Sequence, residues 1–166
     1  YQKHCFFKLM THFLVNISKD FLQKVTNVIF IRDPKEIIFS YSKVIKSPKM
    51  SDIGVKMQFD LFNYLEKSNS KAIVLDSKYL LENPEEILKK LCDMINIPYF
   101  EDMLEWERGP KKEDGVWAKY WYNNVHDSTS FLPYKKKNIQ LTKDLESLYQ
   151  ECLPYYNFLT EKSIKT

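Results

Sequence analysis

Short apolar runs alternate with helix-like stretches along the chain, and this order is the feature that most restricts its fold. Residues 28–31 (VIFI) and 71–76 (KAIVLD) have the continuous apolar character of strands buried on both faces. Residues 5–10 (CFFKLM) form a similar short run. With helices between these runs, the expected order is strand, helix, strand, helix, helix, strand, helix. This order predicts an α/β fold in which helices flank a mainly parallel β-sheet.

Capping residues indicate where several helices begin. Pro34 suits the first turn of a helix, because its missing N–H costs little there. Asn83, Pro84 and the two acids that follow form a strong start signal for another helix. Further helices are expected at residues 18–25, 52–67, 116–125 and 142–159, the last interrupted by Pro154. No shift in composition marks a second domain, so we predict a single domain over residues 1–166.

The composition fits a globular protein and excludes several classes of function. The chain has 166 residues, of which 44% are hydrophobic, and a formal net charge of +3. This mild charge gives no basis for nucleic-acid binding, and the basic run at residues 135–137 is typical of a solvated loop. The three cysteines lie far apart and fit neither a disulfide framework nor a metal site.

The chain also lacks the sequence signals of a membrane or secreted protein. No run approaches the ~18 apolar residues of a membrane span, and no secretory leader is visible. Together with the separate cysteines, these features favour a cytoplasmic location. The chain begins with Tyr1 rather than Met, so we expect that N-terminal sequence is missing.

Arg32 and Ser40 are the first candidates for ligand binding. Arg32 follows an expected strand, and ligands of open α/β sheets bind beyond the carboxyl ends of strands. Ser40 comes eight residues later, about two turns into the next helix. Both side chains can reach one phosphate only if this helix packs back across the strand tip. The structural alternative is that Asp33 caps the helix and that Ser40 bonds its own backbone.

The segment IRDPKEIIFSY, which contains both residues, resembles the 3′-phosphate-binding segment of sulfotransferases. These enzymes use 3′-phosphoadenosine 5′-phosphosulfate (PAPS). Two more segments are similar to the family: VLDSKYLLENPEEILKKLCDMINIPY and RGPKKEDGVWAKYW. The resemblance implies a P-loop-type α/β fold, PAPS as co-substrate without a metal, and binding of its 3′-phosphate by Arg32 and Ser40.

The resemblance also implies roles for residues outside this segment. In the family a Lys that assists the leaving group and a His base lie close together, and the matching residues are Lys8 and His12. The loop that closes over the nucleotide matches Arg108, Lys111, Lys112 and Trp117. Three of these assignments have a structural alternative. His12 could cap a helix, the three basic residues could belong to a solvated charged loop, and Trp117 could pack in the core. His126 is compatible with either a structural or an acceptor-facing role.

Three features depart from the family pattern. The best-known cytosolic members space the Lys and His as Lys-x-His, whereas three residues separate Lys8 from His12. Ser77 stands where the family has an adenine-contacting Tyr, so the resemblance assigns no residue to that contact. The Ser/Gly/Thr-rich loop that grips the 5′-phosphosulfate is absent from these 166 residues. We therefore expect an incomplete sulfotransferase-like domain that lacks its N-terminal donor-loop segment.

Three functions are compatible with this pattern. The first is transfer of a sulfuryl group to a hydroxyl or amine of a small-molecule or glycan acceptor. The second is a non-catalytic binding module that keeps the nucleotide fold. The third is another P-loop enzyme such as a small-molecule kinase, for which Asp76 is the acid to consider as a Mg²⁺ ligand. The sequence specifies neither the acceptor nor the oligomeric state.

Overall fold

The structure is a computed structural model that describes residues 4–11, 14, 16–116 and 118–166. The chain divides into two compact units, each described by itself here. Unit 1 consists of residues 1–75 and 137–163, and unit 2 of residues 76–136 and 164–166. The single-domain assignment, including its missing donor-loop segment, stays a prediction.

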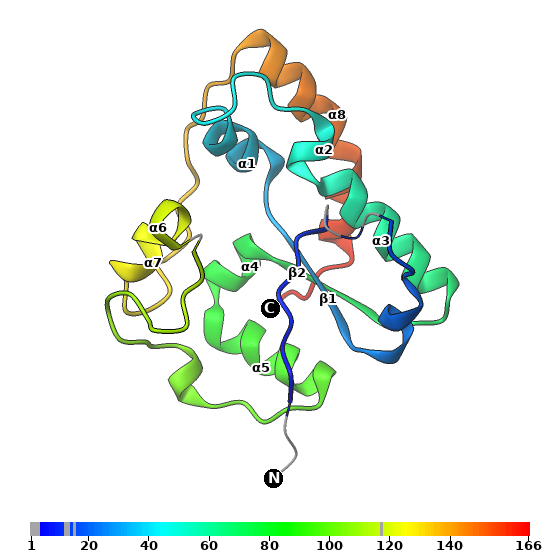
Figure 1. Ribbon diagram of the computed structural model, residues 1–166, viewed down its shortest axis with the longest axis vertical. Coiled ribbons are helices and arrows are strands. Elements are labelled where there is room, and N and C mark those ends of the chain that lie inside the picture. Colours follow the sequence, from blue (N-terminus) through cyan, green and yellow to red (C-terminus); the bar gives the residue numbers. More distant parts are fainter. Residues whose placement is uncertain (1–3, 12–13, 15, 117) are drawn as a thin grey trace. The chain divides into compact units, whose positions relative to one another are not determined.

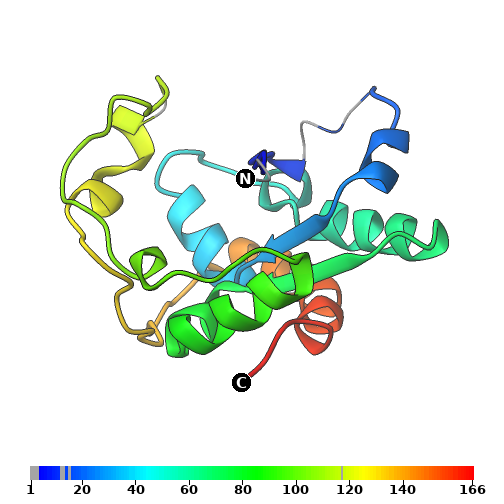
Figure 2. The same ribbon diagram turned by 90° about the horizontal axis from the view of Figure 1, so that it is seen from below.

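Unit 1 contains a parallel sheet of two strands, β1 (Asn27–Ile31) and β2 (Ala72–Asp76), which lie side by side in Figures 1 and 2. Helices flank this sheet, so the predicted α/β fold class is confirmed. Val74 of β2 also forms a parallel bridge with Ser163, which follows the last helix. The C-terminal end of the chain therefore extends the sheet without a full third strand.

The two strands differ in burial. β2 is buried along most of its length, as its continuous apolar run predicts. In β1, Ile29 and Ile31 are buried but Phe30 between them is 50% exposed, so the expected burial on both faces is wrong. The side-chain amide of Gln58 donates a hydrogen bond of 2.8 Å to the Phe30 carbonyl oxygen. A helix side chain, rather than another strand, thus satisfies this backbone group of β1.

Helices supply most of the core of unit 1. They are the 3₁₀ helix η2 (Asp20–Lys24) and the α-helices α1 (Pro34–Tyr41), α2 (Met50–Ile53), α3 (Val55–Lys67) and α8 (Lys143–Glu161). Helix α8 packs against both α1 and α3. Phe59 of α3 lies between two rings of α8, with centroid distances of 5.2 Å to Tyr155 and 5.1 Å to Phe158. Ile31 and Ile38, on either side of the β1–α1 turn, are completely buried.

Two further expectations for unit 1 are wrong. The helix expected at residues 52–67 is divided by Gly54, whose φ of +78° belongs to the left-handed region that favours glycine. The strand expected at residues 5–10 is an exposed segment without regular structure, in which Phe6 is 89% exposed. A strand needs a neighbour for its backbone N–H and C=O groups, and the described part of the sheet holds only β1 and β2.

Unit 2 consists of short helices and loops. Its elements are α4 (Ser77–Glu82), α5 (Pro84–Ile95), η3 (Glu101–Met103), α6 (Ala118–Trp121) and α7 (Asn123–His126). Helix α5 begins as predicted, and the Asn83 side-chain amide donates to the Glu86 carboxylate at 2.8 Å. The single aromatic helix expected at residues 116–125 is replaced by α6 and α7. Within the described ranges, no helix combines the length and apolarity needed to cross a membrane.

Asp76, the acid considered for a Mg²⁺ ligand, lies at the carboxyl end of β2. Its side chain is completely buried, and Oδ1 accepts a hydrogen bond of 2.8 Å from the backbone N–H of Lys78. It is therefore the N-cap of α4, a helix that the sequence analysis did not predict.

Candidate anion-binding site

The turn between β1 and α1 places Arg32 at the edge of the sheet. Arg32 is the first residue beyond the carboxyl end of β1. Asp33 is the N-cap of α1: its Oδ1 accepts a hydrogen bond of 2.8 Å from the Lys35 backbone N–H. Pro34 is buried at the first helical position. The capping role expected for Asp33 is therefore confirmed, and Arg32 lies directly beside the first turn of α1.

Arg32 is held by Glu36, one turn further along the chain. Glu36 Oε2 accepts hydrogen bonds from Arg32 Nε at 3.0 Å and Nη2 at 2.5 Å. The Glu36 side chain is only 11% exposed, whereas that of Arg32 is 44% exposed. Both bonds go to one carboxylate oxygen. The other N–H donors of the guanidinium make no hydrogen bond with any described residue. Arg32 is thus oriented and still has donors available for a ligand.

Ser40 is exposed in the second half of α1. Its hydroxyl makes no hydrogen bond with any described residue. The bond to the helix backbone that was considered for Ser40 is made instead by Ser42, whose hydroxyl donates to the Phe39 carbonyl oxygen at 3.0 Å. The Ser40 hydroxyl is therefore available for a ligand, and its sharing of a phosphate with Arg32 stays a prediction.

Two lysines of unit 1 also contact carboxylates near this turn. Lys137 Nζ lies 3.6 Å from Glu36 Oε2, the same oxygen that binds Arg32. Lys35 points to a different partner: its Nζ is 3.6 Å from Glu146 Oε2 and 5.2 Å from the centre of the Tyr149 ring. Burial is the main cause that raises the pKa of Tyr149, and the carboxylates of Asp33 and Glu146 raise it further. This tyrosine therefore stays neutral beside them.

The structure describes one of the two residues predicted for catalysis, Lys8, and does not describe Trp117, which was predicted to bind the nucleotide. His12 and Trp117 lie outside the described residues. Lys8 lies in the exposed segment of residues 4–10, and its role as a leaving-group cation stays a prediction.

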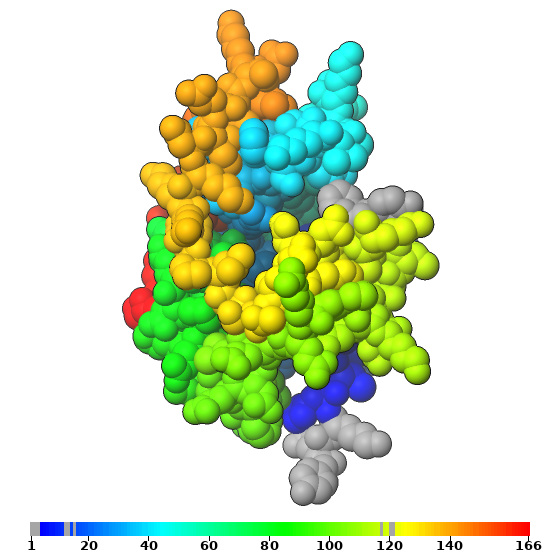
Figure 3. Space-filling view, turned by 90° about the vertical axis from the view of Figure 1, so that its left-hand side faces the viewer, coloured from blue at the N-terminus to red at the C-terminus, as the bar shows by residue number. Residues whose placement is uncertain are grey.

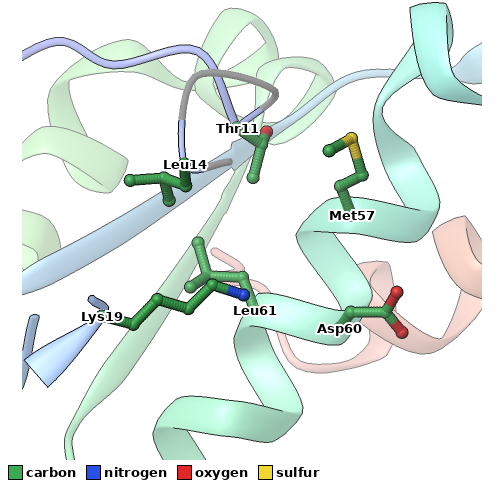
Figure 4. A pocket seen from close by; sticks show the side chains of 6 residues that line it. All are labelled: Thr11, Leu14, Lys19, Met57, Asp60 and Leu61. Atoms are coloured by element: carbon green, nitrogen blue, oxygen red, sulfur yellow. The ribbon is translucent and has the colours of Figure 1, made fainter. Parts of the chain in front are cut away.

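A pocket of unit 1 lies between the residues that follow this segment and helix α3 (Figure 4). Thr11, Leu14, Lys19, Met57, Asp60 and Leu61 line it. Its two charged residues already interact elsewhere. Asp60 forms an ion pair of 2.7 Å with Lys56, and Lys19 Nζ lies 5.7 Å from the centre of the Tyr64 ring. The pocket therefore does not present the group of unpaired donors that a phosphate needs.

The other basic residues predicted to bind the nucleotide belong to a loop of unit 2. Arg108 forms an ion pair with Asp127 at 3.1 Å, and Lys111 forms one with Glu107 at 2.7 Å. Lys112 is exposed and makes no ion pair in the part of the chain that the structure describes. The predicted site residues are thus divided between the two units.

This loop has an internal anchor that the sequence analysis missed. His126 Nε2 and Asp114 Oδ2 are 2.8 Å apart, with side chains 20% and 21% exposed. The same oxygen accepts a hydrogen bond of 2.8 Å from the Lys111 backbone N–H. This backbone bond, and secondarily His126, lowers the pKa of Asp114, while partial burial opposes the shift. Because Gly109 N–H also donates to the His126 carbonyl at 2.8 Å, the anchor ties residues 109–114 to α7.

The ends of the loop are joined as well. Glu105 and Ser130 form an antiparallel bridge, and the Trp106 N–H donates to the Thr129 carbonyl oxygen at 2.8 Å. We call residues 105–130 the basic loop after its four cations, Arg108, Lys111, Lys112 and Lys119, which are accompanied by five acidic residues. It runs over the surface in yellow-green and yellow in Figure 3. These bonds close the segment at its base, and helices α6 and α7 lie within it.

The comparison with protein families agrees with the resemblance seen in the sequence. A family model described as a sulfotransferase domain matches residues 1–163. "Branched-chain-amino-acid aminotransferase-like protein 1" of Arabidopsis thaliana is 34% identical over 146 residues, which are 88% of this chain and 26% of that protein. The corresponding protein 2 of the same plant is 32% identical with the same coverage. The chain thus spans about a quarter of the length of these curated relatives. No solved structure matches.

Proposed function

Because the chain belongs to the sulfotransferase domain family, we propose that it is the nucleotide-binding part of an enzyme that transfers a sulfuryl group from PAPS. The acceptor would be a hydroxyl or amine of a small molecule or glycan. The proposal concerns the full-length protein, because this chain spans only about a quarter of the length of the curated relatives that it matches.

The arrangement of Arg32 is the observation that supports this proposal most. It lies beyond the carboxyl end of β1 and beside the first turn of α1, whose partial positive charge favours an anion. Its planar guanidinium keeps donors for a phosphate while Glu36 holds it in place. We assign the 3′-phosphate of PAPS to Arg32, with the Ser40 hydroxyl as a second donor.

The remaining roles follow from the chemistry of sulfuryl transfer. The sulfuryl group moves from the phosphate oxygen to the acceptor, and the acceptor loses a proton to a base. We propose that Lys8 stabilises the charge on the leaving phosphate and that His12 is the base. Arg108, Lys111 and Lys112, with Trp117, would cover the bound nucleotide after Arg108 and Lys111 exchange their exposed carboxylate partners for it.

Isothermal titration calorimetry of the full-length protein tests the proposal. Adenosine 3′,5′-bisphosphate is the product nucleotide, and AMP is the matched ligand that lacks only the 3′-phosphate. We expect clearly tighter binding of the bisphosphate, because a guanidinium recognises the additional phosphate. Equal affinities for the two nucleotides would remove the assigned role of Arg32.

A non-catalytic binding module that keeps the nucleotide fold is the second candidate function. The kinase alternative has less support, because the matching family model is that of a sulfotransferase domain and Asp76 is used as a helix cap. The enzyme and the module differ in one assay: only the enzyme consumes PAPS when mixed acceptor pools are added to the full-length protein.

A further inference from the structure

We infer that Lys137 is a second phosphate-binding cation beside Arg32, an inference that rests on the proposed nucleotide function. Lys137 is far from Arg32 in the sequence and belongs to a basic run whose expected role was that of a solvated loop. The fold brings it to the β1–α1 turn, where it contacts the carboxylate that also binds Arg32.

The geometry of the two cations suits a single phosphate. Arg32 Nη2 is 2.5 Å and Lys137 Nζ is 3.6 Å from the same atom, Glu36 Oε2. The two nitrogens can therefore be no further apart than these two distances together. A phosphate monoester presents three terminal oxygens, so it can accept charge-assisted hydrogen bonds from both cations at once.

Differences in exposure determine which charges an incoming anion meets. The side chains of Arg32 and Lys137 are 44% and 56% exposed, but that of Glu36 is only 11% exposed. The Glu36 carboxylate lies on the buried side of the two cations and reduces the repulsion between them. Arg32 and Lys137 therefore remain accessible to solvent. These three groups carry a net charge of one positive unit, which attracts a phosphate dianion.

The neighbouring lysines do not share this arrangement. Lys135 and Lys136 are exposed and make no ion pair within the described ranges. Lys35, although it is in the first turn of α1, pairs with Glu146 and not with Glu36. Lys136 is thus a matched control, because its replacement removes the same charge one residue away from Lys137.

Calorimetry of full-length variants with adenosine 3′,5′-bisphosphate tests the role of Lys137. We expect Lys137→Ala to weaken binding by about tenfold, because one of two charge-assisted contacts is lost. Lys136→Ala should change the affinity by less than about twofold, because Lys136 is exposed and, unlike Lys137, makes no ion pair with Glu36. The affinity for AMP should be the same in both variants. Lys137→Gln, which keeps most of the side-chain length, should repeat the loss, and Lys137→Arg should restore most of the affinity.

The outcomes separate this inference from the proposed function. Equal effects of Lys137→Ala and Lys136→Ala, with binding still dependent on Arg32 and on the 3′-phosphate, would overturn the role of Lys137 alone. If Arg32→Ala also had no effect and the protein bound AMP as tightly as the bisphosphate, both assignments would fall. A preference for the bisphosphate that decreases in Lys137→Ala but not in Lys136→Ala supports both.

Discussion

The β1–α1 turn and the basic loop both carry cations proposed to meet the same nucleotide, but they are ordered in different ways. At the turn, Glu36 is nearly buried and Arg32 follows a strand whose last residue, Ile31, is completely buried. In the basic loop the carboxylate partners are exposed: Asp127 by 73% and Glu107 by 90%.

This difference in burial favours different roles for the cations of the turn and those of the loop. Exposed ion pairs contribute little and exchange readily with solvent or a ligand. Under the proposed function, the turn would recognise the 3′-phosphate with a cation that Glu36 already holds, and the cations of the loop would have to leave their exposed partners before they bind an anion. The partly buried Asp114–His126 pair supplies the order that the exposed ion pairs of the loop cannot.

Replacing Arg32 should have the largest effect on the turn. We expect Arg32→Ala to weaken binding of adenosine 3′,5′-bisphosphate by roughly 2–4 kcal/mol, the cost of leaving a charged ligand group unmatched. Lys35→Ala is the matched control, because Lys35 is a cation of the same turn that pairs with Glu146 instead. Calorimetry measures both variants. Similar losses in the two variants would show that only the general positive charge of this region matters.

Removing the Ser40 hydroxyl should have a smaller effect of the same kind. Ser40→Ala should weaken binding of the bisphosphate by about 1 kcal/mol, the usual scale of one hydrogen bond. Ser42→Ala, two residues later, removes a hydroxyl that already bonds to the helix backbone. This control should leave the calorimetric affinity unchanged. An unchanged affinity in Ser40→Ala would restrict recognition to the cations.

Neutralising Glu36 should shift binding in the opposite direction. Glu36→Gln keeps an oxygen for Arg32 but removes a negative charge beside the bound phosphate. We expect affinity for the bisphosphate to rise by about threefold, because like-charge repulsion is lost. Weaker binding would mean that orienting Arg32 outweighs this repulsion.

The basic loop should respond to acid through Asp114. Its pKa lies below the ordinary value of 3.8 in the folded protein, so its stabilising contribution is present above that value and is lost as the pH falls through the lower, folded pKa. Hydrogen exchange of the Gly109 and Lys111 amides, which bond to His126 and Asp114, measures this contribution.

In Asp114→Asn we expect lower protection of these amides near neutral pH and no further loss in acid. Glu113→Gln is the control, because it removes an exposed carboxylate of the same loop that makes no ion pair with any described residue. Equal protection in Asp114→Asn and the native protein would show that the loop is ordered by other contacts. Neither variant should change affinity as much as replacement of Arg32.

The sequence predicted the elements whose signals are local. Asp33 and Pro34 fixed the start of α1, Asn83 and Pro84 fixed that of α5, and the apolar run of β2 indicated its burial. Helix α4 was missed because its cap, Asp76, belongs to the strand pattern that precedes it.

Features that depend on distant residues could not be read in this way. The exposure of Phe30 depends on which elements cover β1, and the contact of Lys137 with Glu36 depends on the path of the chain back from unit 2. The Asp114–His126 pair spans a loop without helical or strand periodicity. The spacing of Arg32 and Glu36 by four residues is the one local signal that could have indicated their ion pair.

The central claim is that Arg32 recognises the 3′-phosphate, and a thermodynamic cycle tests it most directly. The affinities of the full-length protein and of Arg32→Ala are measured for adenosine 3′,5′-bisphosphate and for AMP. We predict that the native protein prefers the bisphosphate and that this preference largely disappears in the variant, while the affinity for AMP hardly changes. A preference of the same size in both proteins would contradict the claim.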